Sequence, residues 1–210
     1  MTDFKPQNLR LTTGYTMGPW INVAPIPAAT TTQAGTPFAQ DIQKSLDKAG
    51  PSTTSLSQFN VGLDWVPLTG SASGVPIQSG LAVQFGFSPS MLGVAEENVR
   101  HDYSGAIASR TVLMLPSVYP LDLGFNAGAT VYVMADKGTP RGAESKQDTS
   151  GVVVAAHVSS DISGPIGLGL FWSAGLGISH VTGTTVGQSA IPVSSENAFT
   201  ATLSLGWKLD

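Results

Sequence analysis

The segment Leu121–Ala135 constrains the fold most strongly, because apolar residues alternate with small or polar ones along its whole length. Successive side chains of a β-strand point to opposite faces, so this segment is expected to form a strand with one apolar face. It runs for fifteen residues, whereas ordinary strands have about 5–6. Such a long and regular pattern predicts a strand that crosses a thick layer.

Seven other segments show the same alternation, and their connections are long and short in turn. This order is typical of an all-β, up-and-down antiparallel barrel of about eight strands in a membrane, with long loops on one side and short turns on the other. Both termini would then lie on the side of the short turns. The expected strands are Asn8–Gly18, Ser57–Leu68, Ile77–Ser88, Tyr103–Leu115, Leu121–Ala135, Gly151–Ile162, Gly167–Val181 and Phe199–Leu209.

The connections complete a single barrel domain over residues 1–210. The long connections are Pro19–Leu56, Pro89–Asp102, Asp136–Ser150 and Thr182–Ala198, and the short ones are Thr69–Pro76, Pro116–Pro120 and Ser163–Pro165. Within the first long connection, the apolar spacing of Phe38–Ala49 predicts a short helix.

The composition agrees with a membrane barrel. Charged residues make up 11% of the chain, against about 25% in soluble domains, and the mean hydropathy is +0.14. No stretch approaches the roughly 18 apolar residues of a transmembrane helix. The net charge of −4 without a basic run argues against nucleic acid as a partner. The absence of cysteine excludes disulfides and thiolate metal sites.

The second face of the expected strands decides between a membrane barrel and a soluble one. A soluble barrel needs a charged outer surface, but here that face consists mostly of Gly, Ser, Thr, Asn and Gln. Small polar residues suit the narrow lumen of an eight-stranded barrel, where the few charges are expected to pair. The predicted polar network of the lumen contains Arg10, Asp64, Arg110, Asp122, His157, Asp161 and Lys208.

Aromatic residues on the opposite face are expected to contact lipid. Most of them fall near the two ends of their strands, with Tyr119 in a short turn, as in the aromatic girdles at membrane interfaces. Trp172 is the exception, since the predicted boundaries place it in mid-strand. The predicted lipid-facing or girdle residues are Phe59, Trp65, Phe85, Phe87, Trp172, Phe199 and Trp207.

On these segments the chain resembles the small eight-stranded outer-membrane barrels of the OmpA-transmembrane and opacity-protein type. The resemblance covers nearly the whole chain and is architectural, without a diagnostic motif. It implies a bacterial outer-membrane location, and some lipid hydrolases similar to this fold use a His-x-Ser pair with an acid. Because Met1–Arg10 has no apolar signal region, we expect the sequence to be a mature form without its export signal.

One candidate catalytic group is present. His157, Ser159 and Asp161 share a strand face at spacings of about 6–7 Å, which is marginal for the roughly 3 Å contact that an activated serine needs. We therefore expect these side chains to form part of the interior network. The three histidines show no metal-binding spacing, and no cofactor is expected.

Three functions remain open from the sequence. The first is a non-enzymatic outer-membrane barrel with an envelope-structural or adhesive role, or one that passes a small apolar molecule. In this case the bilayer is its partner, and the loops 19–56 and 136–150 are candidates for contact with an extracellular partner. The second is a soluble β-rich subunit of a virion or surface layer, with its apolar faces buried in the assembly. The third is an outer-membrane lipid hydrolase that uses His157 and Ser159.

Overall fold

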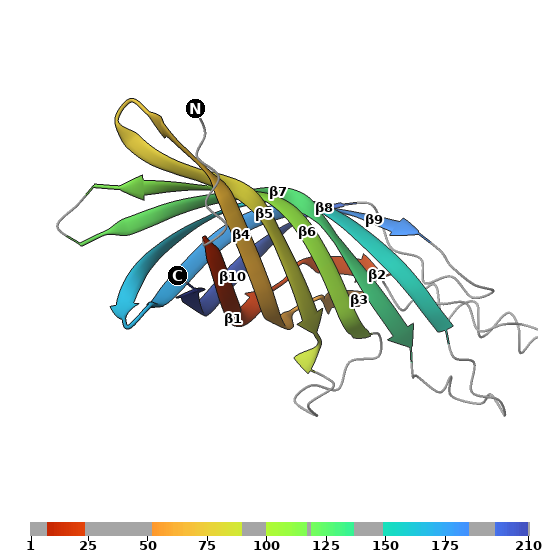
Figure 1. Ribbon diagram of the computed structural model, residues 1–210. Coiled ribbons are helices and arrows are strands. Elements are labelled where there is room, and N and C mark those ends of the chain that lie inside the picture. The colour runs from red at the N-terminus through yellow and green to blue at the C-terminus, as the bar shows by residue number, and fades with distance from the viewer. Residues whose placement is uncertain are drawn as a thin grey trace, which may run out of the picture.

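The computed structural model describes residues 8–23, 52–89, 100–116, 119–136, 149–184 and 196–209. Eight of its ten strands form a closed antiparallel barrel in the order β1-β10-β9-β8-β7-β6-β5-β4 (Figure 1). The other two, β2 and β3, pair with each other as a separate ribbon. The strands are β1 (Leu9–Met17), β2 (Trp20–Val23), β3 (Ser52–Ser55), β4 (Gln58–Ala72), β5 (Val75–Phe87), β6 (Arg100–Leu115), β7 (Leu121–Asp136), β8 (Thr149–Gly167), β9 (Leu170–Thr184) and β10 (Glu196–Leu209).

Strand β1 closes the barrel, because it pairs with β10 on one side and with β4 on the other. Its first residue, Leu9, lies opposite both Leu209 and Trp65. Strands β4 to β10 pair in the order in which they follow one another in the sequence. The described segments contain no helix that is long and apolar enough to cross a membrane. The predicted up-and-down barrel of eight strands is thus confirmed.

Side chains alternate between the lumen and the outer wall along each barrel strand. In β1, for example, Arg10 is 4% exposed whereas the next residue, Leu11, is 44% exposed. In β4, Asp64 is buried between the exposed side chains of Leu63 and Trp65. The polar residues therefore face inward and the apolar residues outward.

Two short turns differ from the sequence prediction. Strand β8 runs through the expected turn Ser163–Pro165 to Gly167, and the chain reverses at Leu168 and Gly169. Likewise, β4 and β5 consume most of Thr69–Pro76, so that the chain reverses at Ser73 and Gly74. All four turn residues have positive φ angles, between 50° and 82°, as the tight turns of two-residue hairpins require.

The lengthened strands β4 and β8 each contain a proline: the sequence predicts Pro165 in a turn and Pro67 in the expected strand Ser57–Leu68. Pro67 and Pro165 lie inside β4 and β8, next to register shifts between Trp65 and Leu68 and between Pro165 and Gly167. A bulge accommodates a residue that cannot donate a ladder hydrogen bond. Proline thus marks irregular strand positions here and does not end the strand.

The short turns β4–β5, β6–β7 and β8–β9 lie at one end of the barrel, which we call the turn end (Figure 1). The start of β1 and the end of β10 lie at the same end, since both strands are antiparallel to their neighbours. The ribbon of β2 and β3 leaves the barrel at the opposite end, here called the loop end. It was not predicted, and the expected helix Phe38–Ala49 falls outside the described residues.

Candidate functional site: the lumen and the outer wall

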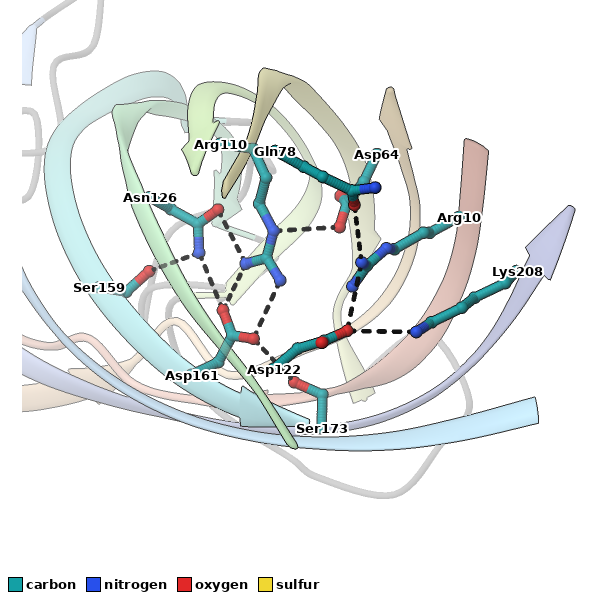
Figure 2. Close-up of polar contacts among 10 residues, drawn as sticks. All are labelled: Arg10, Asp64, Gln78, Arg110, Asp122, Asn126, Ser159, Asp161, Ser173 and Lys208. Carbon is teal, nitrogen blue, oxygen red and sulfur yellow. Dashed lines mark hydrogen bonds and ion pairs between the residues drawn. The ribbon is translucent and has the colours of Figure 1, made fainter. Parts of the chain in front are cut away.

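Charge is fully segregated between the two faces of the barrel wall. Among the residues whose side chains are described, every Arg, Lys, Asp and Glu lies on the lumen face, and none lies on the outer wall. There are three of each sign, so that the set is neutral. These residues are Arg10, Asp64, Arg110, Asp122, Asp161 and Lys208, shown in Figure 2.

Arg110 on β6 is the centre of the first of two ion clusters (Figure 2). Its guanidinium donates through Nη1 and Nη2 to the two carboxylate oxygens of Asp161 on β8, with Nη2 3.0 Å from Oδ1. Its Nε lies 3.3 Å from Oδ2 of Asp64 on β4. A two-pronged contact of this kind matches the planar guanidinium to the carboxylate, and it is stronger than a neutral hydrogen bond.

A second cluster joins β1, β7 and β10 near the turn end. Oδ2 of Asp122 lies 3.2 Å from Arg10 Nη2 and 3.1 Å from Lys208 Nζ. The ring of Phe171 lies beneath both cations, at 5.9 Å from Arg10 Cζ and 6.0 Å from Lys208 Nζ. Cation–π contacts at these distances are favourable. Lys208 is the most solvent-accessible member, with its side chain 42% exposed.

Neutral side chains that were not in the predicted network complete it. Asn126 accepts a hydrogen bond from Arg110 and donates to both Asp161 and Ser159. Ser173 donates to Asp161 at 3.3 Å, and Gln78 accepts from Arg10 at 3.2 Å. Each of the added residues has the inward strand phase, so the same alternation rule that placed the charges would have found them.

Glycines provide the space for these large side chains. A Cβ atom on Gly124 would lie 2.7 Å from Arg110 Nη2, and one on Gly206 would overlap the ring of Phe171. The inward glycines therefore relieve crowding in a narrow barrel, as the sequence predicts, because eight strands leave an interior that side chains fill.

Buried apolar side chains lie in the lumen on both sides of the Arg110 cluster. Val66, Val112 and Phe171, all at most 3% exposed, have the inward phase toward the turn end. Tyr132, Val153 and Val181, all at most 4% exposed, have it toward the loop end. The lumen contains a cavity of about 140 Å³, whose lining combines small and apolar residues with the polar side chains of Asp64, Arg110, Asn126, His157 and Asp161.

The arrangement of His157 and Ser159 does not assemble a catalytic triad. The Ser159 hydroxyl accepts a hydrogen bond from Asn126 at 3.2 Å, and His157 Nδ1 lies 3.3 Å from the Thr130 hydroxyl. Asp161 is engaged by Arg110. An activated serine must contact its base, but the two side chains form no mutual hydrogen bond within the described segments. Among all the residues that the structure describes, no group of three or more His, Cys, Asp or Glu side chains could hold a metal ion.

The outer wall is apolar around the described barrel. Leucine, valine, isoleucine and phenylalanine side chains are exposed on all eight barrel strands or their immediate turns, for example Leu176 at 70% and Phe199 at 72%. Several hydroxyl groups on this wall are paired within the protein: Ser109 donates to the carbonyl of Ala127 and Thr182 to that of Val154, and the hydroxyls of Ser79 and Thr111 lie 3.4 Å apart. Internal pairing of this kind is needed where no water is available.

Aromatic side chains gather toward the two ends of the wall. Tyr15, Phe59 and Phe87 lie next to one another toward the loop end, with ring centroids 5.0 and 5.6 Å apart. Phe85 and Tyr103 continue this row at 6.0 Å. Trp65 and Phe199 also lie on the outer wall, 39% and 72% exposed.

Toward the turn end, Trp172 lies at the third residue of β9 and not in mid-strand, because β9 begins at Leu170. Its ring and that of Tyr119 both approach the backbone of Gly164. Trp207 on β10 approaches Gly169, which lies in the turn between β8 and β9. The residue that seemed to break the pattern of two aromatic belts therefore belongs to one of them.

These observations identify the architecture. The described chain is a closed antiparallel barrel of eight strands with its charged side chains in the lumen and apolar side chains on the outer wall. No protein-family model matches the sequence, and no curated protein matches it. Among solved structures, it is similar to the crystal structure of Neisserial surface protein A, with 6% sequence identity, a TM-score of 0.46, and coverage of 96% of this chain and 97% of that chain.

Proposed function

We propose that the chain is a non-catalytic barrel of the bacterial outer membrane that spans the bilayer and presents its longer connections on one side. The observation that carries this proposal is the placement of all six described charged side chains in the lumen and none on the outer wall. A wall without charge is unsuited to water, and it suits hydrocarbon. The two aromatic belts support the same orientation relative to the membrane.

The lumen supports a structural role over a pore. Arg110, Asp64 and Asp161 bridge the interior, and close-packed apolar side chains lie on either side of them. The lining of the cavity of about 140 Å³ includes the charged side chains of Arg110, Asp64 and Asp161, which make it unfavourable for a small apolar molecule. We therefore favour an envelope-structural or adhesive barrel over passage through its centre.

The proposed partners follow from the same geometry. The bilayer contacts the wall, and connections 19–56 and 136–150 join strands at the loop end, where an extracellular partner would meet them. A soluble assembly subunit is disfavoured because its partners would have to cover apolar side chains around the entire barrel. A hydrolase is disfavoured because the Ser159 hydroxyl accepts a hydrogen bond from Asn126 and, within the described part of the chain, forms none with His157, the residue that would have to activate it.

The first experiment is refolding of the chain into detergent micelles or phospholipid vesicles. We expect a compact form that migrates faster on a gel before heating than after, and that aggregates when the amphiphile is removed. A folded monomer in plain buffer would contradict the proposal. Planar bilayer recordings should show no steady ionic conductance, since the Arg110 cluster and buried apolar side chains occupy the lumen of the described barrel.

A further inference from the structure

The outer wall contains an apolar groove over β8, β9 and β10. Its volume is about 680 Å³, within the range of about 300–1,000 Å³ that small-molecule sites occupy. Its outward-facing lining is almost entirely apolar and includes Phe125, Val158, Leu176, Ile178 and Phe199. It is separate from the polar cavity of the lumen, because the hydrogen-bonded wall of β8 and β9 lies between them.

The groove results from the order of large and small residues across the register. Phe125 lies opposite Ser160, Ser160 opposite Leu176, and Leu176 opposite Ala201, on four successive strands. Long side chains thus alternate with short ones at one level of the wall. Because outward side chains stand roughly perpendicular to the sheet, the short residues form the floor and the long residues form the sides.

The β2–β3 ribbon adds a rim at the loop end of the groove. Trp20, the first residue of β2, lines the groove beside Phe199 and is 48% exposed. Gly18 fixes this position: its φ angle is +79°, and a Cβ atom there would lie 2.6 Å from the Phe199 carbonyl and 3.0 Å from the indole ring. The ring therefore lies where the chain leaves the barrel toward the loop end. Tryptophan favours this level of a membrane, between headgroups and hydrocarbon.

We propose that this groove binds one acyl chain of a membrane lipid, held more tightly than the lipid around the rest of the wall. The inference rests on the proposed membrane location, since it is the surrounding hydrocarbon that supplies the occupant. An apolar groove with Trp20 at its loop-end rim fits a lipid acyl chain that enters the wall from the loop end. Inside the groove, protein side chains contact the lipid acyl chain on two sides, so it gains more dispersion attraction there than on a convex surface.

Native mass spectrometry of the barrel in micelles containing 1-palmitoyl-2-oleoyl-phosphatidylcholine tests this site. We expect the wild type to retain about one phospholipid at collision energies that remove the other lipids and the detergent. Ala201→Leu places a long side chain on the floor of the groove and should reduce the retained fraction at least about tenfold. Trp20→Ala, which removes the rim, should reduce it less.

Ala156→Leu is the matched control, because Ala156 is also an exposed outward residue of the wall but does not line the groove. This variant should retain phospholipid as the wild type does. Heat-dependent gel migration checks that each variant is folded. Equal retention in Ala201→Leu and wild type, or no retained lipid in a folded wild-type barrel, would overturn the acyl-chain site alone. Failure to require an amphiphile would instead overturn the proposed function.

Discussion

Leu203→Arg gives the most direct test of which medium contacts the outer wall. Leu203 is the eighth residue of the fourteen-residue strand β10, and its side chain is 60% exposed. It lies opposite Ala174 and Tyr15, neither of which carries a charge to pair with arginine. It is six residue steps from Leu209 at the turn end, which corresponds to about 15 Å along the barrel axis at a rise of ~3.3 Å and a tilt of ~40°.

This depth sets the magnitude of the effect. An arginine at the middle of the hydrocarbon destabilises a barrel by about 2–4 kcal/mol, and one near the interface by about 0–1 kcal/mol. We therefore expect the larger cost for Leu203→Arg relative to Leu203→Ala. Leu170→Arg, at the first residue of β9 and 41% exposed, should show the smaller cost relative to Leu170→Ala.

The assay is reversible unfolding by guanidinium chloride of the barrel refolded in phospholipid vesicles, followed by tryptophan fluorescence. The alanine variants remove the contribution of lost leucine contacts, so that the remaining difference reports the charge. A water-facing position usually tolerates substitution within about 0.5 kcal/mol. Equal stability of all four variants, or a greater cost at Leu170 than at Leu203, would refute the membrane assignment of this face.

Three further predictions concern the lumen. Asp161→Asn leaves Arg110 without its two-pronged partner and should cost about 3–5 kcal/mol in the same unfolding assay. A cost below about 1 kcal/mol would show that this ion pair is not buried in the folded barrel. Gly128→Ala should cost about 1–3 kcal/mol, because its Cβ would overlap the backbone of β6. Gly105→Ala is the control and should be nearly neutral, because the space around Gly105 is open. The temperature at which each barrel unfolds in the heat-dependent gel assay measures both effects. A fluorophosphonate probe should not label the chain, and labelling that disappears in Ser159→Ala would contradict the non-catalytic assignment.

Alternation alone was sufficient to predict the eight barrel strands and the phase of their side chains. A period of two is insensitive to local composition, so that even the small residues of β9 could be placed correctly beside Trp172. Strand ends were harder, because glycine and proline mark both turns and bulges. The reversal at Leu168 could not be predicted, since leucine rarely adopts the positive φ of 52° seen there.

The partners within the lumen were also beyond the sequence. Strand phase indicates that Arg110 and Asp161 both face inward, but β6 and β8 are not neighbours, and only the curvature of the closed barrel brings these side chains together. The same holds for Arg10 on β1 and Asp122 on β7, which meet across the lumen. The β2–β3 ribbon was missed for a different reason, since four-residue strands are too short to show a period.

These long-range ion pairs connect barrel closure with the membrane environment. An open sheet would leave Arg110 apart from Asp161, and a buried charge without its partner is costly. The pair formed across the lumen by Arg10 on β1 and Asp122 on β7 depends in the same way on the pairing of β1 with β4 and β10. Closure in turn directs every described charge inward and leaves an uncharged wall outward. Because the closed form is the one suited to hydrocarbon, we expect closure and insertion to occur together, and a variant that weakens the Arg110 cluster should slow both by the same factor.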